Sequence, residues 1–572
     1  MSAPLRTRRV LPLARTTRAL MPLMFQLSLI SLTSLPAAGF QYGVPYTFRA
    51  QPVLAEPGRA DTGWYFAAQK TGGAYPRTAT AMREGGFSDL LFDASDPSGH
   101  TFWTIQDRGL AASYDGDGDA NADNDTAYKV FAFPGHHQKL VHIRVTGDSV
   151  ETLSRDSIAG RDTGFVTGLP SSRLATEEAA VRMRLDSAVV HLTPAHRIPP
   201  SPNGYDLEGL ARTADGTFYL ADEMGPRVLR LGAAPFRILR EWTPGNGLPR
   251  VLAQRRDNRG LESLCATPSG KLAGLMQSGL ANTVSGQRAH ARDSTRVLRF
   301  FLFDPVTESV REHVYLADLK RGTRAPADVK AGAMACLGDS SFLVLEHGED
   351  DAGYDWIDLY RIDITPHTSD VHEESDLTGR GRLFQGGLKT LEQVGYIPGD
   401  SAILVASGVT PLQKRLVFGD IIGRTAWRHD TPEGLAIVND STVAVLNDND
   451  YGQKDEDGDG IPHLAGTTRR LTQLMYLPVA PGFATAVRQP AAGSMGGRGA
   501  GFHVRPVPGG WRVTGPRGHR VSVRMVDPRG RTVSAGHGDG AVFVPAPANR
   551  PGVYGLEVRA GSQHGWRRVF AP

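Results

Sequence analysis

Cysteine is nearly missing from this chain of 572 residues, which contains only Cys265 and Cys336. Two cysteines cannot form a disulfide framework, so the fold must depend on a buried core, for which the chain is amply long. Both cysteines occupy the same register in two sequence repeats, where we expect small buried residues on inner strands. A disulfide between them would suit an exported protein. Equivalent positions in neighbouring repeats, however, are expected to lie too far apart for its short Cα separation.

The chain also lacks an excess of charge of one sign. It has 63 Lys and Arg residues against 60 Asp and Glu residues, which gives a formal net charge of +3. No basic stripe is interleaved with aromatic residues. Nucleic acid is therefore excluded as an expected partner.

No run is apolar enough over its length to predict a stable membrane span. The arginine-rich start, the largely apolar run Leu20 to Leu35 and the small residues after it have the layout of a secretory signal peptide. We expect residues 1–39 to be this signal and the protein to be secreted or at the cell surface, with the periplasm as a further location. Arg8-Arg9 leaves a twin-arginine signal open as the minor alternative.

Familiar catalytic motifs are missing as well. The chain has no G-x-S-x-G elbow, no H-E-x-x-H and no Walker A pattern, and its cysteines are not spaced as metal ligands. These absences disfavour serine hydrolases, zinc peptidases and P-loop enzymes.

What the chain does contain is a repeated hairpin with carboxylates at its ends. In Asn203 to Leu231, Glu208-Gly-Leu-Ala leads into an Asp215-Gly216 turn, and a second strand runs into Asp222-Glu223. An Asp-Gly pair between two apolar runs is a strong hairpin signal. Related hairpins begin near Ser88, Leu261, Ala333 and Glu433.

Recurrence of one hairpin at irregular spacing predicts radial repetition, an all-β fold of the β-propeller type. We expect the propeller over residues 86–480, with six blades although five repeats are visible, and residues 40–85 completing it. The stretch Ser172 to Leu192 is predicted to be an amphipathic helix on the rim. Generic β-sandwich hairpins are the alternative, but they do not explain acids at the same register.

The acids expected to converge on the propeller axis need a cation, because clustered carboxylates repel one another. Calcium is the predicted ion. Two Asp/Gly-rich loops would place oxygen donors at alternate residues, although they could equally be remote staples or solvated loops. The predicted metal ligands are Asp107, Glu346, Glu433, Asn447, Asp448, Asp115, Asp117, Asp119, Asp455, Asp457 and Asp459.

Cationic residues near the same strand ends could hold an anionic group, since the planar guanidinium suits phosphate or carboxylate. These predicted substrate-binding residues are Arg108, Arg227, Arg259 and His347. For activation of water between calcium and a carboxylate, the predicted catalytic residues are Glu208, Asp222, Glu223 and Glu262.

Several motifs resemble, in order from Gly86 to Leu477, the phytase-like family, also called "esterase-like activity of phytase". They are D-L-E-G-L-A…D-G-T-F-Y-L-A-D-E-M-G-P, N-R-G-L-E-S-L…M-Q-S-G-L, F-L-V-L-E-H and P-E-G-L-A…L-N-D-N-D-Y. The resemblance implies a β-propeller and calcium-supported phosphomonoester hydrolysis, and the family's name also records esterase activity. The residues that match the acidic signatures of the family, and that the resemblance therefore implies for the site, are Asp107, Glu208, Asp222, Glu223, Glu262, Glu346, Glu433, Asn447 and Asp448. Where similar sequences tend to read Glu-Arg-Asp, this chain has Glu346-His347-Gly348, which replaces a permanent cation with a titratable one.

The composition changes near residue 481. Residues 481–500 are predicted to be a flexible linker, and residues 501–572 alternate like a small β-sandwich. This tail is similar to type IX secretion sorting domains in Arg505 to Gly510, Met525 to Val533 and Arg550 to Val558, which implies export machinery as a partner. A generic immunoglobulin-like domain is the alternative.

Taken together, these patterns predict a secreted calcium-dependent phosphoric ester hydrolase acting on a small molecule. A carboxylesterase or lactonase propeller and a non-catalytic calcium-binding propeller remain the alternatives.

Overall fold

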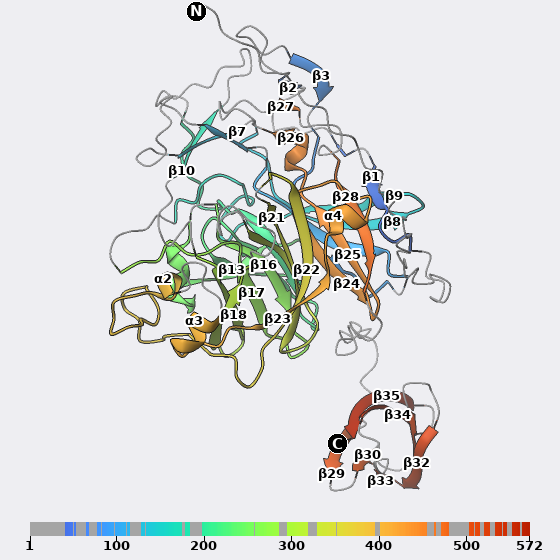
Figure 1. Cartoon of the computed structure of the whole chain (residues 1–572). Helices are drawn as coiled ribbons and strands as arrows, with labels where there is room; N and C mark the ends of the chain where they lie inside the picture. The colour runs from blue at the N-terminus through green and yellow to red at the C-terminus, as the bar shows by residue number, and fades with distance from the viewer. Residues whose placement is uncertain are drawn as a thin grey trace, which may run out of the picture.

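In the computed structural model of the chain, the regular secondary structure is almost all β-strand (Figure 1). It describes residues 40–479 except 50, 53–64, 68–76, 82, 97, 110, 115–126, 132, 174–177, 183–196, 257, 285–294, 319–328, 351, 395–400, 455–462 and 465–470, and it describes residues 503–507, 510–514, 520–526, 532–539, 541–545, 552–560 and 563–571. The predicted signal peptide and linker lie outside the described residues. No helix among the described residues is long and apolar enough to cross a membrane.

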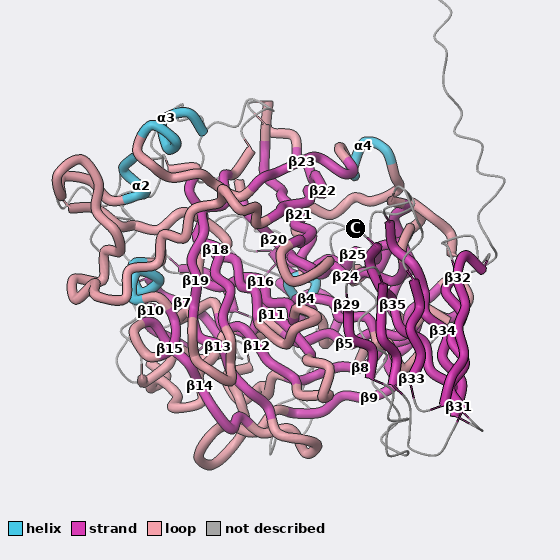
Figure 2. Tube along the Cα trace, turned by 90° about the horizontal axis from the view of Figure 1, so that it is seen from below, coloured by secondary structure: helices cyan, strands magenta, loops and turns pink. Residues whose placement is uncertain are grey.

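The larger body contains five antiparallel blades of four strands, and the outer strands of the first and last blades pair in parallel and join them into one sheet. Figure 2 shows the strands in magenta. Blade one contains β4 (Phe87–Phe92), β5 (Thr101–Gln106), β8 (Lys139–Thr146) and β9 (Ser149–Ser157). Blade two contains β11 (Leu207–Arg212), β12 (Phe218–Asp222), β13 (Arg227–Leu231) and β14 (Ile238–Pro244), with β15 (Gly247–Leu248) at its edge. Blade three contains β16 (Leu261–Ala266), β17 (Leu272–Met276), β18 (Val297–Phe303) and β19 (Val310–Leu316). Blade four contains β20 (Lys330–Cys336), β21 (Ser341–Glu349), β22 (Asp355–Asp363) and β23 (Gln413–Phe418). Blade five contains β24 (Pro432–Asn439), β25 (Thr442–Asn447), β28 (Gln473–Pro478) and β1 (Pro45–Phe48).

The inner strands close into a ring. Strands β4, β11, β16, β20 and β24 each contact the next in that order, and β24 contacts β4 again. This is a β-propeller, as the repeats predict. The described residues form five blades, so the prediction of six is wrong. The reason is that the N-terminal segment adds one strand, β1, which pairs with β28 of blade five and with β9 of blade one, instead of forming a blade with chain ends.

A separate hydrophobic core fills each interface between neighbouring blades. Tyr205 and Leu220 of blade two, for example, pack against Ile105 and Leu140 of blade one. Equivalent clusters lie between blades two and three, three and four, four and five, and five and one. Because both faces of each blade are covered, inner strands such as β16 and β17 are buried along their whole length.

Cys265 and Cys336 form a disulfide with a Cα separation of 5.6 Å. The expectation that they lie too far apart is therefore wrong. Cys265 is the next-to-last residue of β16, and Cys336 is the last residue of β20. These two strands are the inner strands of blades three and four, and they contact each other. In a ring of five blades, inner strands approach closely enough for a bridge.

The prediction of a rim helix from Ser172 to Leu192 is also wrong for the part of this stretch that the structure describes. Glu178–Arg182 is strand β10, which pairs in parallel with β7 (Ala127–Phe131), next to β6 (Ala111–Tyr114). The rest of that stretch is only described at residues 172 and 173. Helical propensity is a weak preference, and pairing with a neighbouring strand overrides it here.

The remaining elements are short and lie outside the blades. They are β2 (Tyr65–Ala67), β3 (Arg77–Ala81), η2 (Arg250–Gln254), α2 (Leu391–Val394), α3 (Ser401–Ala406), α4 (Ile421–Arg424), η4 (Asp450–Gly452), β26 (Gln453–Lys454) and β27 (His463–Leu464). The segment that carries α2 and α3 packs against β18 and β19 of blade three through Phe384, Leu391 and Leu404.

The C-terminal strands form a small β-sandwich, as their alternation predicts. One sheet contains β29 (His503–Val507), β30 (Gly510–Thr514) and β33 (Ala541–Pro545). The other contains β32 (Thr532–Asp539), β31 (Arg520–Val526), β34 (Gly552–Ala560) and β35 (Gln563–Ala571). Both sheets contribute to one core of their own, which includes Trp511, Val523, Val544 and Leu556.

Candidate functional site

Three rings of equivalent residues surround the propeller axis at the end of the inner strands where the sequence places its acids. The bulge ring follows from β-bulges at equivalent positions in four inner strands, each of which leaves one residue without a partner in the next strand: Glu208, Glu262, Gly332 and Glu433. In blade one the register shifts further along the strand, between Ser88 and Leu91. A bulge re-aims the side chain of the extra residue and often lies beside active sites. The charges of Glu262 and Glu433 both act on Glu208, so these glutamates from three blades lie close together.

The exit ring consists of the residues at which the second strand of each blade leaves its pairing with the first: Asp107, Glu223, Gln277, His347 and Asp448. In four blades the backbone N–H of the exit residue donates to the carbonyl of a residue just before the inner strand, at 2.8 to 3.2 Å. These pairs are Asp107 with Gly86, Glu223 with Asp206, Gln277 with Gly260 and Asp448 with Thr431. His347 pairs with Lys330 in the same position. Those facing residues form the third, or leading, ring: Gly86, Asp206, Gly260, Lys330 and Thr431.

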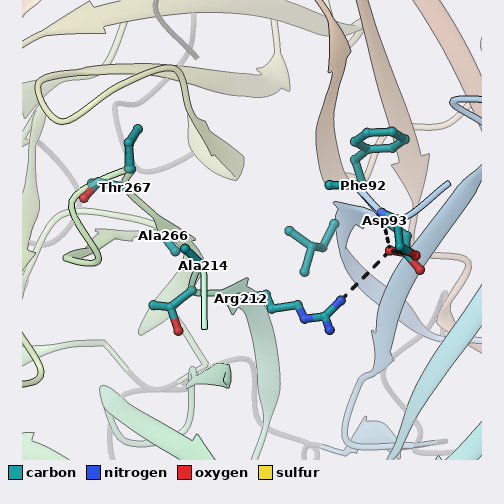
Figure 3. Close-up of a pocket in the computed structure, with 11 residues that line it drawn as sticks. Phe92, Asp93, Arg212, Ala214, Ala266 and Thr267 are labelled. Atoms are coloured by element: carbon teal, nitrogen blue, oxygen red, sulfur yellow. Dashed lines mark hydrogen bonds and ion pairs between the residues drawn. The ribbon is translucent and has the colours of Figure 1, made fainter. Parts of the chain in front are cut away.

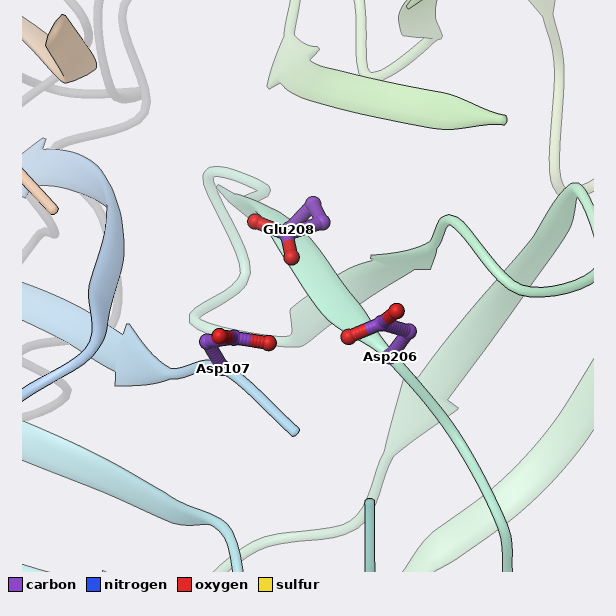
Figure 4. A group of neighbouring side chains, drawn as sticks. All are labelled: Asp107, Asp206 and Glu208. Atoms are coloured by element: carbon purple, nitrogen blue, oxygen red, sulfur yellow. The ribbon is translucent and has the colours of Figure 1, made fainter. Parts of the chain in front are cut away.

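One carboxylate triad joins blades one and two. Oxygen atoms of Asp107, Asp206 and Glu208 all lie within 4.8 Å of one another. Figure 4 shows the three carboxylates pointing toward a common centre, with Glu208 on its strand and Asp206 just before it. The strand pairing of blade two and the end of β5 in blade one therefore bring three acids together.

A second triad shares Asp107 with the first. It consists of Asp107, Asp448 and Asp450, whose carboxylate oxygens also lie within 4.8 Å of one another. Asp448 directly follows β25, and its Oδ1 accepts a hydrogen bond of 3.0 Å from the Asp450 N–H. Asp107 thus lies between the acids of blade two and those of blade five.

The protein environment makes the charged form of these acids costly. Burial raises the pKa of Asp107 well above its usual range, and the charges of Asp206 and Asp448 raise it further. Burial and the charge of Asp107 do the same for Glu208, and burial and the charge of Asp450 for Asp448. Like charges held this close require either protons or a cation.

The donor set fits a calcium ion. Every member of both triads offers carboxylate oxygen, which hard cations prefer, and neither triad contains a cysteine or histidine that a softer metal would favour. Asp206 Oδ1 and Glu208 Oε2 are buried and have no hydrogen-bond partner among the residues that the structure describes. Leaving buried carboxylate oxygens without partners is unfavourable, and a cation would satisfy both.

Away from the triads, carboxylates and cations lie together, so their charges partly cancel. Glu223 and Glu262 are buried neighbours, and the charges of Arg259 and Lys330 act on both. Burial, followed by the charge of Asp206, raises the pKa of Glu223 to about 7. Burial, followed by the charge of Glu223, raises the pKa of Glu262 to about 8. Two of the four predicted catalytic acids are therefore placed beside cations instead of in the triads.

Blade four departs from the other blades at the site. Its bulge residue is Gly332, where a Cβ atom would lie 2.5 Å from the Pro432 carbonyl oxygen and 3.2 Å from the His347 ring. Burial, assisted by the charges of Lys330 and Arg259, lowers the pKa of His347 to about 3. The histidine is therefore neutral at physiological pH and is not the anion-binding cation that we predict from the sequence.

The structure gives Asp222 and Arg227 a positioning role instead of direct contact with the site. Both are fully buried, and Arg227 Nε donates to Asp222 Oδ2 at 2.5 Å. The other oxygen of Asp222 accepts from the Asp206 N–H at 2.6 Å. Asp222 therefore fixes the loop that carries Asp206 and Glu223, and it has no free oxygen for catalysis.

Two predicted metal ligands are also used elsewhere. Glu346 accepts hydrogen bonds from the Tyr315 hydroxyl at 2.5 Å and from Lys414 Nζ. Asn447 Oδ1 accepts from the Gln473 N–H at 2.7 Å, and its Nδ2 donates to the Asp448 carbonyl at 2.7 Å. Side chains alternate along a strand, so residues one position before the exit ring point into the blade interfaces.

The predicted substrate-binding arginines are placed differently from one another. Arg108 is buried, with Nη1 3.2 Å from Asp206 Oδ2 and 3.0 Å from Asn258 Oδ1. It thus partly neutralises the first triad. Arg259 is half-buried and its charge reaches Glu223 and Glu262.

Asp206 and Lys330 belong to the leading ring but are not among the site residues that the sequence predicts. Asp206 could have been found, because it directly precedes Leu207-Glu208 in the strongest repeat. Lys330 could not, because its blade has lost the acid that marks the others. The predicted calcium loops Asp115, Asp117, Asp119 and Asp455, Asp457, Asp459 lie outside the described residues.

A further hollow lies at the opposite ends of the inner strands. It is lined by the hairpin turns of blades one, two and three, including Phe92, Ala214 and Thr267, with an ion pair of 4.0 Å between Arg212 and Asp93 (Figure 3). Asp93 is also paired with His142 at 3.0 Å. Because its charged groups already have partners, this hollow is not the candidate site.

Comparison with solved structures finds only weak likeness. A protein from Lactobacillus plantarum is 11% identical over 72% of this chain and 98% of its own, with a TM-score of 0.26. Virginiamycin B lyase from Staphylococcus aureus is 9% identical over 68% and 95%, with a TM-score of 0.24. PorZ, a type IX secretion component of Porphyromonas gingivalis, is 12% identical over 87% and 82%, with a TM-score of 0.18. Likeness at this level says nothing about function.

No curated protein matches the chain. The phytase-like family, described as esterase-like activity of phytase, matches residues 83–451, more than half of the chain. That span runs from the start of blade one through the second triad, so it includes all three rings around the axis. With its inner-strand acids gathered at one end of a propeller, the chain belongs to the phytase-like family.

Proposed function

We propose that this protein is a calcium-dependent phosphoric ester hydrolase acting on a small molecule. The observation that supports it is the pair of carboxylate triads that share Asp107 at the propeller axis. Family membership supports a hydrolase, and the carboxylate chemistry supports calcium as the ion. The residues that would hold it are Asp107, Asp206, Glu208, Asp448 and Asp450, with Glu433 beside them.

Bound at the triads, calcium would polarise a phosphoryl oxygen and make a coordinated water more acidic. The protein's own groups would do the rest. Asp222 and Arg227 hold the Asp206 and Glu223 loops in place, and Arg108 limits the charge of the first triad. Glu223 and Glu262 are the carboxyl groups beside the site that can hold or release a proton near neutral pH.

A carboxylesterase is the second candidate, because the family description itself names an esterase-like activity. The two are separated by assaying the purified protein against p-nitrophenyl phosphate, phytate and p-nitrophenyl acetate, with calcium and with chelator. We expect calcium-dependent phosphate release. Acetate cleavage alone would select the esterase, and no turnover by a folded, calcium-loaded protein would contradict both.

The site itself is tested by Glu208→Gln, which removes a charge from the first triad while keeping the side chain's size. We expect the calcium-dependent activity to fall by more than about a hundredfold, since loss of even an outer-shell partner commonly costs ten- to a hundredfold. Asp148→Asn, at an exposed turn of blade one, is the matched control and should leave activity unchanged.

Calcium binding has a readout that does not depend on activity. If the ion binds only the folded protein, a hundredfold excess over its dissociation constant adds about 2.7 kcal/mol to the free energy of unfolding. Chelator should therefore lower the melting temperature of the wild type and have little effect on Glu208→Gln. An identical melting temperature with and without chelator would remove calcium from the proposal.

We also propose that the protein is exported to an oxidising compartment or the cell surface. Support comes from the Cys265–Cys336 disulfide, because such bonds persist mainly outside the reducing cytosol. Cell fractionation with and without residues 1–39 tests this proposal, and retention of the full chain in the cytosol would contradict it.

A further inference from the structure

The fivefold pattern of the site is broken at blade four. Blades two, three and five each bring a glutamate to the bulge ring, whereas blade four brings Gly332. Its exit residue is the neutral His347, and its leading residue is Lys330 where blade two has Asp206. Among the described residues of the three rings, blade four is thus the one blade that contributes a cation and no carboxylate.

Blade four also lies across the ring from the first triad. The inner strands follow one another in the order of blades one to five and then close. The first triad spans blades one and two, so blade four faces it from the far side of the axis. A bound molecule that contacts cations at the triad would turn its opposite side toward Lys330.

The side chain of Lys330 has no hydrogen bond or ion pair with any residue in the described part of the chain, although the charges of Glu262, Glu433 and Glu223 act on it. Two other half-buried lysines of the propeller do have such partners. Lys139 Nζ lies 2.8 Å from Glu84 Oε1, and Lys414 is paired with Glu346. Lys330 is half-buried, and its ammonium offers three donors that no described residue uses.

Together, Lys330 and Arg259 favour an anion over a second metal ion at blade four. Arg259 lies close enough for its positive charge to act on Lys330, on His347 and on both Glu223 and Glu262. Two cations at one place repel a metal ion and attract an oxyanion. Because Gly332 stands where blades two, three and five have glutamate, blade four has no carboxylate of its own at the bulge to compete for the ammonium.

We propose that Lys330, together with Arg259, forms an oxyanion subsite on the blade-four side of the axis and binds the phosphoryl group of the substrate opposite the carboxylate triads. This rests on the proposed phosphoric ester hydrolase and names the side of its site that recognises the anion. Ammonium and guanidinium groups form strong charge-assisted hydrogen bonds with phosphoryl oxygens. An uncharged carboxylic ester would gain little from them.

The test measures binding of inorganic phosphate to the calcium-loaded full chain by calorimetry, for the wild type, Lys330→Gln and Lys330→Arg. We expect Lys330→Gln to weaken phosphate binding at least about tenfold, as loss of a charge-assisted hydrogen bond does, and Lys330→Arg to keep part of the affinity. Lys389→Gln, at an exposed lysine, is the control and should bind phosphate like the wild type. Calcium stoichiometry should be the same in all four proteins.

Unchanged phosphate affinity in folded Lys330→Gln, or no phosphate binding by the wild type, would overturn the subsite. If Lys330→Gln does not fold, lysine acylation of the wild type followed by mass spectrometry replaces it, and phosphate must then protect Lys330 but not Lys389. Lys330-dependent phosphate binding without phosphoester turnover would uphold the subsite and contradict the hydrolase. Turnover whose KM and phosphate inhibition are unaffected by Lys330→Gln would uphold the hydrolase and contradict the subsite.

Discussion

At the scale of single residues, two neighbours in the sequence can have different roles, one buried inside a blade and the other at the site. Asp222 is buried against Arg227 inside blade two, whereas Glu223, the next residue, belongs to the exit ring. The same division separates Glu346 from His347 and Asn447 from Asp448. The alternation of side chains at the end of a strand is sufficient to explain it. Mutations at adjacent positions should therefore have different consequences.

We expect Asp222→Asn to lower the free energy of unfolding, because it breaks the buried ion pair with Arg227. Within the described part of the chain, Arg227 would stay charged with Glu241, 3.4 Å away, as its remaining carboxylate partner. Removing one member of a buried ion pair costs about 3–5 kcal/mol. Urea unfolding should show a loss of this order, while Glu223→Gln should cost much less. A change below about 1 kcal/mol for Asp222→Asn would contradict the positioning role.

A buried neutral histidine predicts acid sensitivity. Burial, with smaller effects from the charges of Lys139 and His137, lowers the pKa of His136 to about 3, against about 6.5 in an unfolded chain. Because the folded-state pKa is lower, the unfolded state binds the proton first, and stability falls as pH drops below about 6.5. At pH 5 the loss from this residue is about 2 kcal/mol.

Urea unfolding of the wild type and His136→Gln at pH 7 and pH 5 checks this expectation. The variant should lose about 2 kcal/mol less than the wild type between the two pH values. Equal losses would mean that His136 is not held neutral in the folded protein.

At the scale of elements, the inner strands of the blades carry both the site and the links between blades. The bulges near the start of β11, β16 and β24 aim glutamates at the axis, while the far ends of β16 and β20 carry the disulfide. Strand β16 therefore carries a residue of the candidate site, Glu262, at one end and the disulfide that links two blades at the other. Mutating the far end should affect stability without changing the site.

Replacing both Cys265 and Cys336 by alanine should lower the free energy of unfolding by about 4 kcal/mol, the chain-entropy value for a bridge that closes a loop of 71 residues. Calcium affinity should be unchanged, since the triads lie in blades one, two and five. Thermal unfolding with and without reductant measures the effect, to which the double variant should be insensitive. A wild type equally stable under reducing conditions would contradict the expectation.

At the scale of the whole molecule, the propeller and the C-terminal sandwich have separate hydrophobic cores. Five interface clusters hold the blades together, and a sixth, around Trp511 and Leu556, belongs to the sandwich alone. None of the residues in the sandwich core belongs to the propeller clusters. Each body therefore has its own source of stability.

Deleting residues 501–572 should leave the melting temperature of the propeller within the experimental error and leave calcium-dependent activity unchanged. Separate cores unfold as separate cooperative units. Calorimetry of the full chain and the truncated chain compares the transitions. If the deletion lowered the melting temperature of the propeller by several degrees, the sandwich would be an integral part of it.

The sequence by itself determined the repeating hairpin, the propeller class, the family and most of the acids at the site. Glu208, Glu223, Glu262, Glu433, Asp107 and Asp448 all lie in the bulge or exit rings. These features could be predicted because they are local. A turn, a two-residue alternation and an acid at a fixed distance from the turn are visible within a single hairpin.

Only the tertiary structure decided how many blades close the ring, whether the cysteines meet, and which residues share the axis. Asp206 and Lys330 take equivalent positions in blades two and four, 124 residues apart by number, yet no local pattern relates them. Blade number depends on how inner strands pack around the axis, and the 5.6 Å approach of Cys265 and Cys336 follows from it. Through-space distances between remote segments are set by packing of whole blades, and local periodicity carries no record of them.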